Sequence, residues 1–554
     1  MRKFLSVLIL TSVLVLPFPL ATAQRKATKP KAVSSVAAQR GIDTISATQM
    51  HDYLSFIASD EMEGRDTPSR GLDLTAKFLA TNLARWGFKP AGDNDSFFQK
   101  ISLRRDAIDK ELTHVTLNGQ NLSLGDDYIP AGRGGDGSGS LVFAGNGWFV
   151  KTKGIDPYKD IDATGKIAVV FTPPDGFPRG FSPTDFSGKR GEDWIDPSEN
   201  ARKHGAVGII LVPGFQFLAN WDRNRQRMTE RGATTVEKFN PPTGESLPTI
   251  IASPRLTNLL FQGERQNATS LFDAAATGTL PASFELSAEK KIAMTVVGKK
   301  DPIWTQNVVA VFEGSDPVLK DEYVAVGAHY DHVGIGAPVN GDSIYNGADD
   351  DGSGTTALLA MAEALAKAPI RPKRSVVFIW HAGEEKGLWG SRYFVENPTI
   401  PLNKIVTQLN IDMIGRSKKA GDTNPRNKEL SGPDEIYVIG SKMMSTELGE
   451  LSESVNKGYL NLSFNYRYDD PADPNRFFFR SDHFNYARKG IPIIFYFDGE
   501  HEDYHRPGDS PDKIDYNKME KVTRTVYMML WELANRPARP TVDKQLPKGL
   551  TGGN

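Results

Sequence analysis

Histidine and acidic residues recur just after apolar runs in the second half of this chain. Imidazole and carboxylate groups are ligands for divalent metal ions, and carboxylates also accept and donate protons in catalysis. The residue types therefore predict a metal-dependent catalytic site. The candidates are His329, Asp331, the triplet Asp349 to Asp351, the pair Glu384 and Glu385, Asp412 and His505.

The absence of cysteine restricts the choice of metal ligands. The 554 residues contain none, which excludes thiolate zinc sites, iron–sulfur clusters and cysteine nucleophiles. Two imidazoles and three carboxylates suit zinc, with manganese or cobalt less favoured. A single ion would not need three carboxylates. Two divalent ions carry four positive charges, which three carboxylates and one hydroxide would balance, and a shared aspartate could hold the ions about 3.5–4 Å apart. We therefore predict two zinc ions, with ligands drawn from His329, Asp350, Glu385, Asp412 and His505.

Residues beside these ligands suggest further roles. Asp331 lies two positions after His329 and could accept the second N–H of that imidazole, fixing its tautomer. Neighbouring side chains diverge, so one glutamate of the pair can bind metal while the other moves protons. We assign metal binding to Glu385 and proton transfer to Glu384. Asp349 and Asp351 could merely cap the following helix.

The elements that must position these residues are apolar runs typical of buried parallel strands. Four runs fit, and a helix over 355–367 separates the first two. In open α/β sheets, ligand sites collect outside the carboxyl ends of the strands. We therefore expect an α/β fold with a mostly parallel, doubly wound sheet flanked by helices. The four strands are predicted over 323–328, 375–380, 405–411 and 491–497.

The chain is too long for one hydrophobic core. Helical patterns between residues 46 and 86 give way to short strands among glycines and prolines, and long strands return near residue 290. This change predicts a discontinuous main domain over 44–125 and 289–540. A smaller, β-rich α/β domain over 126–288 is inserted, and 541–554 form a tail.

The N-terminus is typical of a signal peptide. Arg2 and Lys3 precede the apolar run 4–20, and a small-residue site ends at Ala23. We predict cleavage after Ala23, a spacer over 24–43, and export to the periplasm or the medium. A retained membrane anchor is the alternative, which Pro17 and Pro19 disfavour. No stable membrane span is expected after cleavage.

Charge and motifs exclude other functions. Lys and Arg number 66 against 68 Asp and Glu, so no positive field would attract nucleic acid. The segment from Gly347 to Gly352 lacks the Lys and Ser or Thr of a phosphate-binding loop. Adjacent residues such as Ser481, Asp482 and His483 seldom form a hydrolase triad, and no nucleophile elbow accompanies them.

Five motifs follow one another along the second half of the chain. They are GAHYDH at 327–332, GADDDGSG at 347–354, GEEKG at 383–387, NIDMIG at 410–415 and YH at 504–505. In this order they resemble the di-zinc exopeptidase family that contains bacterial leucyl aminopeptidases and glutamate carboxypeptidase. The resemblance covers roughly residues 44 to 125 and 290 to 535. The intervening segment is similar to a protease-associated domain, which could narrow the substrate entrance.

The resemblance implies a role for each candidate. His329 and Asp412 would bind one zinc, Glu385 and His505 the other, and Asp350 would bridge them. Glu384 would be the general base.

The resemblance also implies an activity. We expect an exported di-zinc aminopeptidase that hydrolyses N-terminal residues of peptides or small proteins. A basic pocket for a terminal carboxylate would instead favour a carboxypeptidase. Some relatives cyclise N-terminal glutamine and others are non-catalytic receptors, so glutaminyl cyclase-like activity and a binding protein remain alternatives.

Overall fold

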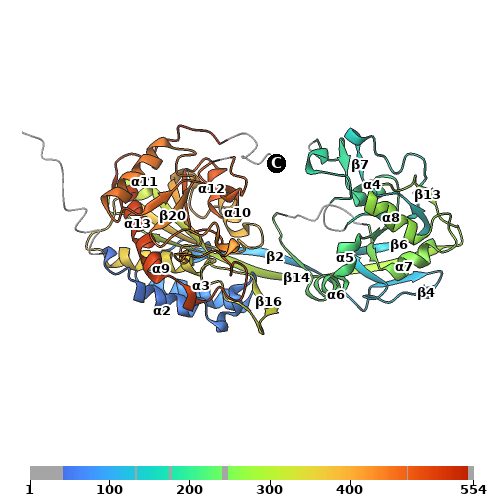
Figure 1. Cartoon of the computed structure of the whole chain (residues 1–554), viewed down its shortest axis with the longest axis horizontal. Helices are drawn as coiled ribbons and strands as arrows, with labels where there is room; N and C mark the ends of the chain where they lie inside the picture. Colours follow the sequence, from blue (N-terminus) through green and yellow to red (C-terminus); the bar gives the residue numbers. More distant parts are fainter. Residues whose placement is uncertain are drawn as a thin grey trace, which may run out of the picture.

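The computed structural model describes residues 41–546, apart from 132–133, 174–176, 187, 240–246 and 471. The predicted signal peptide, most of the spacer and the end of the tail lie outside this range. Two lobes are joined by two long antiparallel strands, β2 (Phe98–Ile108) and β14 (Lys291–Phe312) (Figure 1). The first lobe contains α2, α3 and the elements after β14, and the second contains the elements from β3 to β13.

A mostly parallel sheet forms the centre of the first lobe, as predicted. Three successive pairings, β18 with β15, β15 with β19 and β19 with β22, are all parallel. Antiparallel neighbours flank them, β14 beside β18 and β20 (Glu435–Ile439) beside β22. The parallel strands are β15 (Tyr323–His329), β18 (Ser375–His381), β19 (Ile405–Ile411) and β22 (Ile493–Phe497).

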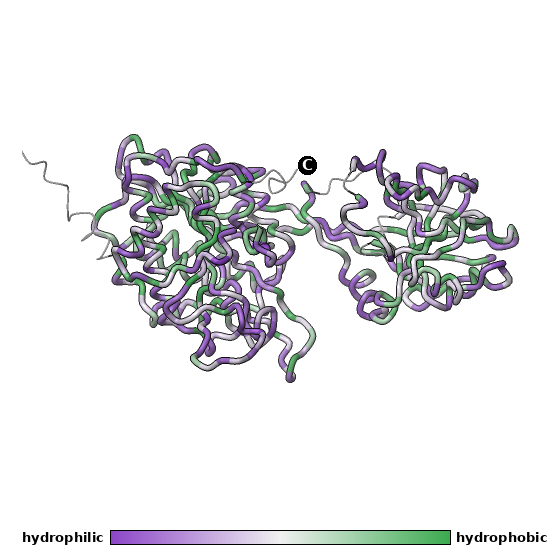
Figure 2. The backbone as a smooth tube through the Cα atoms, turned by 45° about the horizontal axis from the view of Figure 1, so that its top comes forward, coloured by the Kyte–Doolittle hydropathy of each residue, from purple (hydrophilic) through white to green (hydrophobic). Residues whose placement is uncertain are grey.

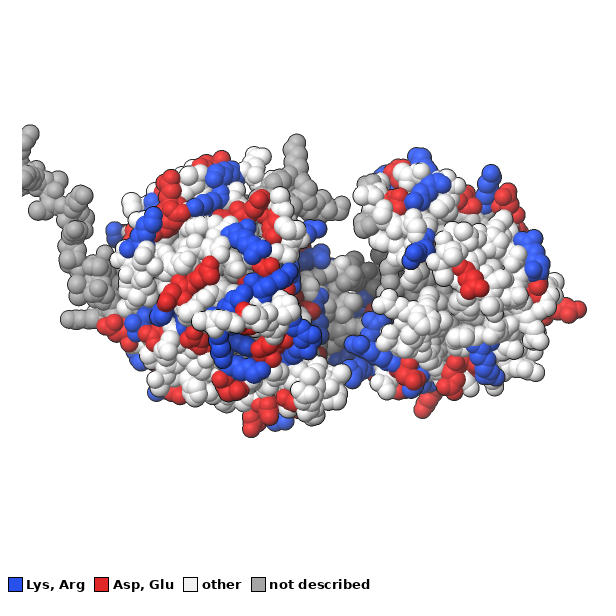
Figure 3. Space-filling view, in the orientation of Figure 1, with Lys and Arg blue, Asp and Glu red and all other residues white. Residues whose placement is uncertain are grey.

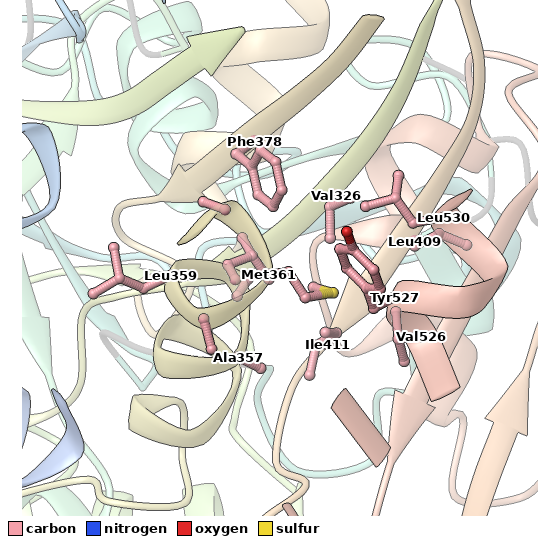
Figure 4. Packing of buried hydrophobic residues seen from close by; sticks show 14 of the residues in the cluster. Val326, Ala357, Leu359, Met361, Phe378, Leu409, Ile411, Val526, Tyr527 and Leu530 are labelled. Atoms are coloured by element: carbon pink, nitrogen blue, oxygen red, sulfur yellow. The ribbon is translucent and has the colours of Figure 1, made fainter. Parts of the chain in front are cut away.

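Alternating side chains of this sheet pack into two apolar layers. Val326 and Phe378 face one layer, whereas Ala325 and Ile379 face the other. Figure 4 shows the first layer, where the sheet meets two helices. Apolar segments lie inside both lobes (Figure 2). Helices therefore cover both faces of the sheet, and in the described part of the chain five lie over the first layer and two over the second. The five are α2 (Ala47–Ile57), α3 (Arg70–Arg85), α9 (Gly352–Lys367), α11 (Thr446–Gly458) and α13 (Tyr516–Asn535), and the two are α10 (Trp389–Glu396) and α12 (His483–Ala487).

The second lobe has its own sheet and its own apolar clusters. Its strands run in the order β13, β6, β8, β10, β12, β5. Three longer helices accompany them, namely α4, α7 and α8. Their bounds are β5 (Tyr128–Ala131), β6 (Gly134–Phe143), β8 (Ile167–Phe171), β10 (Gly208–Val212), β12 (Thr249–Ala252), β13 (Phe284–Glu285), α4 (Pro197–Lys203), α7 (Pro254–Phe261) and α8 (Ala268–Thr277).

Residues before 126 also pack with the second lobe. Strand β3 (His114–Leu117) pairs with the first half of β14, and its Val115 lies in a cluster of that lobe. The predicted domain boundaries remain a prediction, and this pairing favours an earlier start for the insert. Conversely, β11 (Ala233–Val236) belongs to the second lobe in sequence but pairs with β2, outside the sheet of that lobe. Among the described residues, no helix combines the length and apolar character that crossing a membrane requires.

Candidate metal centre

The candidate ligands meet at one edge of the central sheet. Strand β15 ends at His329, and the loops after β18 and β19 carry the glutamate pair and Asp412. These strands are parallel, so their carboxyl ends lie at the same edge. Asp350 lies just before α9, and His505 comes from the loop after β22.

His329 lies at the centre of a first group of ligand atoms. Its Nε2 is 3.3 Å from Asp350 Oδ1 and 3.5 Å from Asp412 Oδ1. All three side chains are buried, and one ligand atom from each lies within 4.8 Å of the others. This group has the composition of a zinc site with an open position.

A second group shares Asp350. The Nε2 atom of His505 lies 3.1 Å from Asp350 Oδ2 and 3.1 Å from Glu385 Oε2. Asp350 thus presents one carboxylate oxygen to each group. The structure brings all five predicted ligand residues together.

His332 belongs to the second group, although the sequence analysis did not select it. Its Nδ1 is 2.8 Å from Glu385 Oε1 and 3.7 Å from Asp350 Oδ2. Its position three residues after His329, inside the same motif, is the signal that could have identified it. His332 and His505 both approach the carboxylates of this group.

The donor atoms fit a pair of metal ions. Within the described ranges, no Lys or Arg forms an ion pair with Asp350, Glu385 or Asp412. Asp350 Oδ2, Glu385 Oε1, His505 Nε2 and both ring nitrogens of His332 lack a hydrogen bond there. Buried atoms that approach one another without hydrogen-bond geometry are expected where ligands converge on a common point. Imidazoles and carboxylates are also the ligand types that zinc accepts.

Asp331 contacts His329 differently from the expectation. The His329 Nδ1 atom is 3.1 Å from the main-chain oxygen of Asp331 and 3.7 Å from its carboxylate Oδ1. The carboxylate instead accepts hydrogen bonds from Thr67 Oγ1 at 3.0 Å and from the Glu384 N–H at 3.1 Å. The Asp331 backbone therefore orients the imidazole, and its side chain holds the loop that carries Glu384.

The two glutamates differ in their electrostatic surroundings. Burial raises the pKa of Glu384 well above its usual value, and the charges of Glu385 and Asp412 raise it further. Burial and Asp350 also tend to raise the pKa of Glu385, but the adjoining imidazoles of His332 and His505 lower it to about 2. Paired carboxylates with such divergent environments suit different roles, one as a proton carrier and one as an anion.

The other residues of the acidic triplet have structural partners. Asp351 caps α9, because its carboxylate accepts from the Gly354 N–H at 2.8 Å. Asp349 accepts from the Gly415 N–H at 2.6 Å. Asp351 therefore has the capping role that the sequence suggested, whereas Asp349 contacts the loop after β19 and does not cap α9.

The segment 481–483 does not form a triad. Ser481 Oγ accepts from Asn410 Nδ2 at 2.9 Å, and His483 Nε2 contacts the Phe478 carbonyl at 2.8 Å. Asp482 lies 3.4 Å from His381. This agrees with the rejection of a serine hydrolase.

Arg65 joins the loops of the centre, although it is not among the residues that the sequence pointed to. Its buried guanidinium donates to the carbonyls of Tyr330 at 3.0 Å, Asn346 at 2.7 Å and Gly347 at 2.8 Å. The first carbonyl belongs to the loop of His329, and the other two to the loop of Asp350. One side chain thus fixes the spacing of the two loops.

The chain matches known proteins in sequence. The model of peptidase family M28 matches residues 307–530. A probable zinc metalloprotease of Pyrenophora teres f. teres is 30% identical over 384 residues, which are 63% of this chain and 75% of that protein. The chain belongs to peptidase family M28. Leucine aminopeptidase 2 of Arthroderma otae is 26% identical over 52% of this chain and 59% of its own length.

Comparison of structures agrees with the M28 fold. An aminopeptidase from Aneurinibacillus sp. strain AM-1 matches 91% of this chain and 98% of its own, with a TM-score of 0.51 and 15% identity. Membership in family M28 makes this protein a zinc-dependent hydrolase of the metallopeptidase class, with peptides as substrates.

Proposed function

We propose that this M28 peptidase is an exported aminopeptidase that uses two zinc ions. His329 and Asp412 would hold one ion, Glu385 and His505 the other, and Asp350 would bridge them. The observation that carries this proposal is the position of Asp350, whose two oxygens face different histidines at 3.3 and 3.1 Å. A shared carboxylate is the usual bridge of a two-metal site.

The residues around the site suit hydrolysis. Two zinc ions would supply an activated water and positive charge for the peptide carbonyl oxygen. Glu384 would accept the proton of that water and donate it to the departing amine. Its Oε2 lies 3.9 Å from His329 Nε2, so it adjoins the centre without belonging to either ligand group. Asp331 would keep it there through the Glu384 N–H.

The direction of cleavage rests on the relatives. Proteins named leucine aminopeptidase are among the sequence matches. The His505 side chain is 38% exposed, whereas the other ligands are almost fully buried, so the centre opens on the His505 side. Carboxypeptidase activity is the second candidate, because a cavity with basic residues adjoins the centre.

Metal analysis combined with substrate pairs tests the proposal. We expect close to two zinc ions per chain and release of nitroaniline from leucine p-nitroanilide. Acetylation of the substrate amine should abolish cleavage, because an aminopeptidase binds the free amine. Cleavage of N-acetylated dipeptides would favour the carboxypeptidase, and conversion of N-terminal glutamine to pyroglutamate without peptide cleavage would favour a cyclase. A zinc-free, inactive protein would contradict both peptidase candidates.

The N-terminal segment and the insert complete the proposal. Residues 1–23 would direct export and be removed after Ala23. The second lobe would be a protease-associated domain. Mass determination of the protein recovered from the periplasm or medium tests the first point, since a chain that begins at Gln24 is expected.

A further inference from the structure

A cavity of about 750 Å³ lies where the two lobes meet, beside the metal centre. Three parts of the chain line it. The first lobe contributes the loop from Glu63 to Ser69 together with Lys386 and Trp389, β2 contributes Arg105, and the second lobe contributes residues between Arg227 and Thr234. Figure 3 shows Lys and Arg side chains gathered at this junction.

Two arginines of this cavity have no partner among the residues that the structure describes. Within the described residues, neither Arg105 nor Arg231 forms an ion pair or a side-chain hydrogen bond. Two of the three carboxylates that line the cavity are already engaged. Asp66 lies 2.7 Å from Lys386 Nζ, and Glu230 lies 3.7 Å from Lys110 Nζ outside the cavity. Among the described residues that line the cavity, Glu63 is the remaining carboxylate that could oppose the guanidinium groups of Arg105 and Arg231.

The backbone holds these two arginines close together. Strand β11 pairs with β2 so that Thr234 lies opposite Arg105, and Arg231 precedes β11 by two residues. Between them, Gly232 has φ of +71° and packs against the Arg105 side chain. A Cβ there would lie 2.8 Å from the Asp106 carbonyl oxygen, so the close approach needs glycine. The arrangement is set by the sheet rather than by flexible side chains alone.

Two residues that line the cavity connect it to the metal centre. Thr67 lines the cavity, and its Oγ1 donates to Asp331, which in turn accepts from the Glu384 N–H. Lys386 lines the cavity and directly follows Glu385. A peptide with its scissile bond at the centre could therefore extend toward the arginines.

We propose that this cavity binds a carboxylate of the peptide substrate through Arg105 and Arg231, so that the insert contributes directly to substrate selection. Guanidinium groups bind carboxylates in a bidentate manner. The carboxylate would be the C-terminal one of a short peptide or that of an acidic side chain beyond the cleaved bond. This inference rests on the proposed peptidase function, and it names short or acidic peptides as the preferred substrates.

Binding measurements test the inference separately from turnover. The zinc-loaded full-length chain carrying Glu384→Gln, which should cleave far more slowly than the unaltered protein, is titrated calorimetrically with Leu-Gly and with its C-terminal amide. Leu-Glu amide and Leu-Gln amide form the second pair. We expect one anionic probe to bind about tenfold tighter than its neutral counterpart, as a charged hydrogen-bonded pair would give. The pair that shows the preference identifies the source of the carboxylate.

Variants then locate the effect. Arg105→Gln combined with Arg231→Gln should bring the ratio of affinities close to one. Arg223→Gln is the matched control, because Arg223 is exposed on the preceding helix, α6 (Trp221–Arg225), and lies outside the cavity. Since Arg231 is exposed, Arg231→Glu should fold normally and should reverse the preference.

The outcomes separate the two proposals. Equal affinities within both probe pairs, or a preference that survives the double variant, would overturn the inference. A preference that disappears in the double variant supports it, even if the wild-type chain cleaves no peptide. In that last case the proposed function fails while the carboxylate site stands.

Discussion

Two buried polar clusters flank the segment Asp349 to Asp350, and they balance their charge differently. The metal centre contains only carboxylates and imidazoles. The second, here called the Arg416 cluster, consists of Asp349, Asp498, His501, Asp503, Asp509, Arg416 and Lys518. Arg416 Nη2 lies 2.9 Å from Asp503 Oδ2, and Lys518 Nζ donates to Ser431 Oγ at 2.8 Å.

The difference indicates which cluster needs an outside cation. Burying a carboxylate is costly unless a positive charge accompanies it. The Arg416 cluster contains its own cations, so it can be stable without a metal. In the metal centre, the described ranges offer only histidines as ion-pair partners of Asp350. Similar residue types therefore have a structural role in the Arg416 cluster and the proposed catalytic role in the metal centre.

Replacing Asp350 should give the largest effect. We expect Asp350→Asn to reduce the zinc content below one ion per chain and to remove nearly all activity, because the neutral amide keeps only one oxygen in place of the carboxylate that faces both ligand groups. Since ligand binding to the native state stabilises it, added zinc should no longer raise the melting temperature. Metal analysis and thermal unfolding with and without zinc measure both effects. Retention of two ions in this variant would contradict the bridging role.

Replacing Glu384 should separate catalysis from metal binding. Glu384→Gln should lower kcat by about 10²–10⁴-fold, the usual contribution of a general base, with the zinc content unchanged. Glu385→Gln is the matched neighbour, and it should lose metal. If Glu384→Gln loses zinc instead, our division of the pair is wrong.

Arg416→Met should show the opposite behaviour to Asp350→Asn. It removes the cation that lies 3.7 Å from the fully buried Asp509, whereas Asp503 keeps Lys513 as its partner. The free energy of unfolding should therefore fall by about 3 kcal/mol. The loss should be the same with and without zinc, and the folded fraction should bind zinc normally. Denaturant unfolding followed in both conditions provides the measurement. A decrease in the free energy of unfolding that occurs only in the zinc-loaded protein would contradict the distinction between the two clusters.

Replacing Arg65 should weaken the metal centre without touching a ligand. Arg65→Met removes the donors that hold the carbonyls of Tyr330, Asn346 and Gly347. We expect zinc affinity to fall about 10–100-fold, as for other residues that orient ligands. The absorption spectrum of the cobalt-substituted protein should also change, which a loss of stability alone would not cause. An unchanged spectrum and affinity would limit Arg65 to a role in folding.

The sequence predicted the parallel strands well because apolar side chains occupy every position of a strand buried on both faces. The run 405–411 coincides with β19, and 323–328 is one residue shorter than β15. Helix capping offered a structural role for Asp349 or Asp351, and the resemblance to the family motifs pointed to Asp350 within the triplet. His332 and Arg65 escaped notice for different reasons. The imidazole resembles any loop histidine in sequence, and the arginine acts on carbonyl groups that are far away along the chain.

His483 shows what burial does to a histidine that has no metal-centre role. It stacks on Phe495 with ring centroids 4.4 Å apart, and burial lowers its pKa to about 3. In the unfolded chain its pKa would be about 6.5. Between these values the unfolded state binds more protons, so stability is lost as pH falls from about 6.5 to about 3.

Replacement of His483 by a neutral residue should remove this part of the pH dependence. His483→Gln keeps a donor for the Phe478 carbonyl but cannot be protonated. The slope of unfolding free energy against pH should decrease by at most about 1.4 kcal/mol per pH unit in that window. Denaturant unfolding of both proteins at several pH values between 4 and 7, without zinc, measures the difference. Parallel curves would mean that His483 binds protons equally in the native and unfolded states. Burial would then not be sufficient to keep this histidine neutral in the native protein.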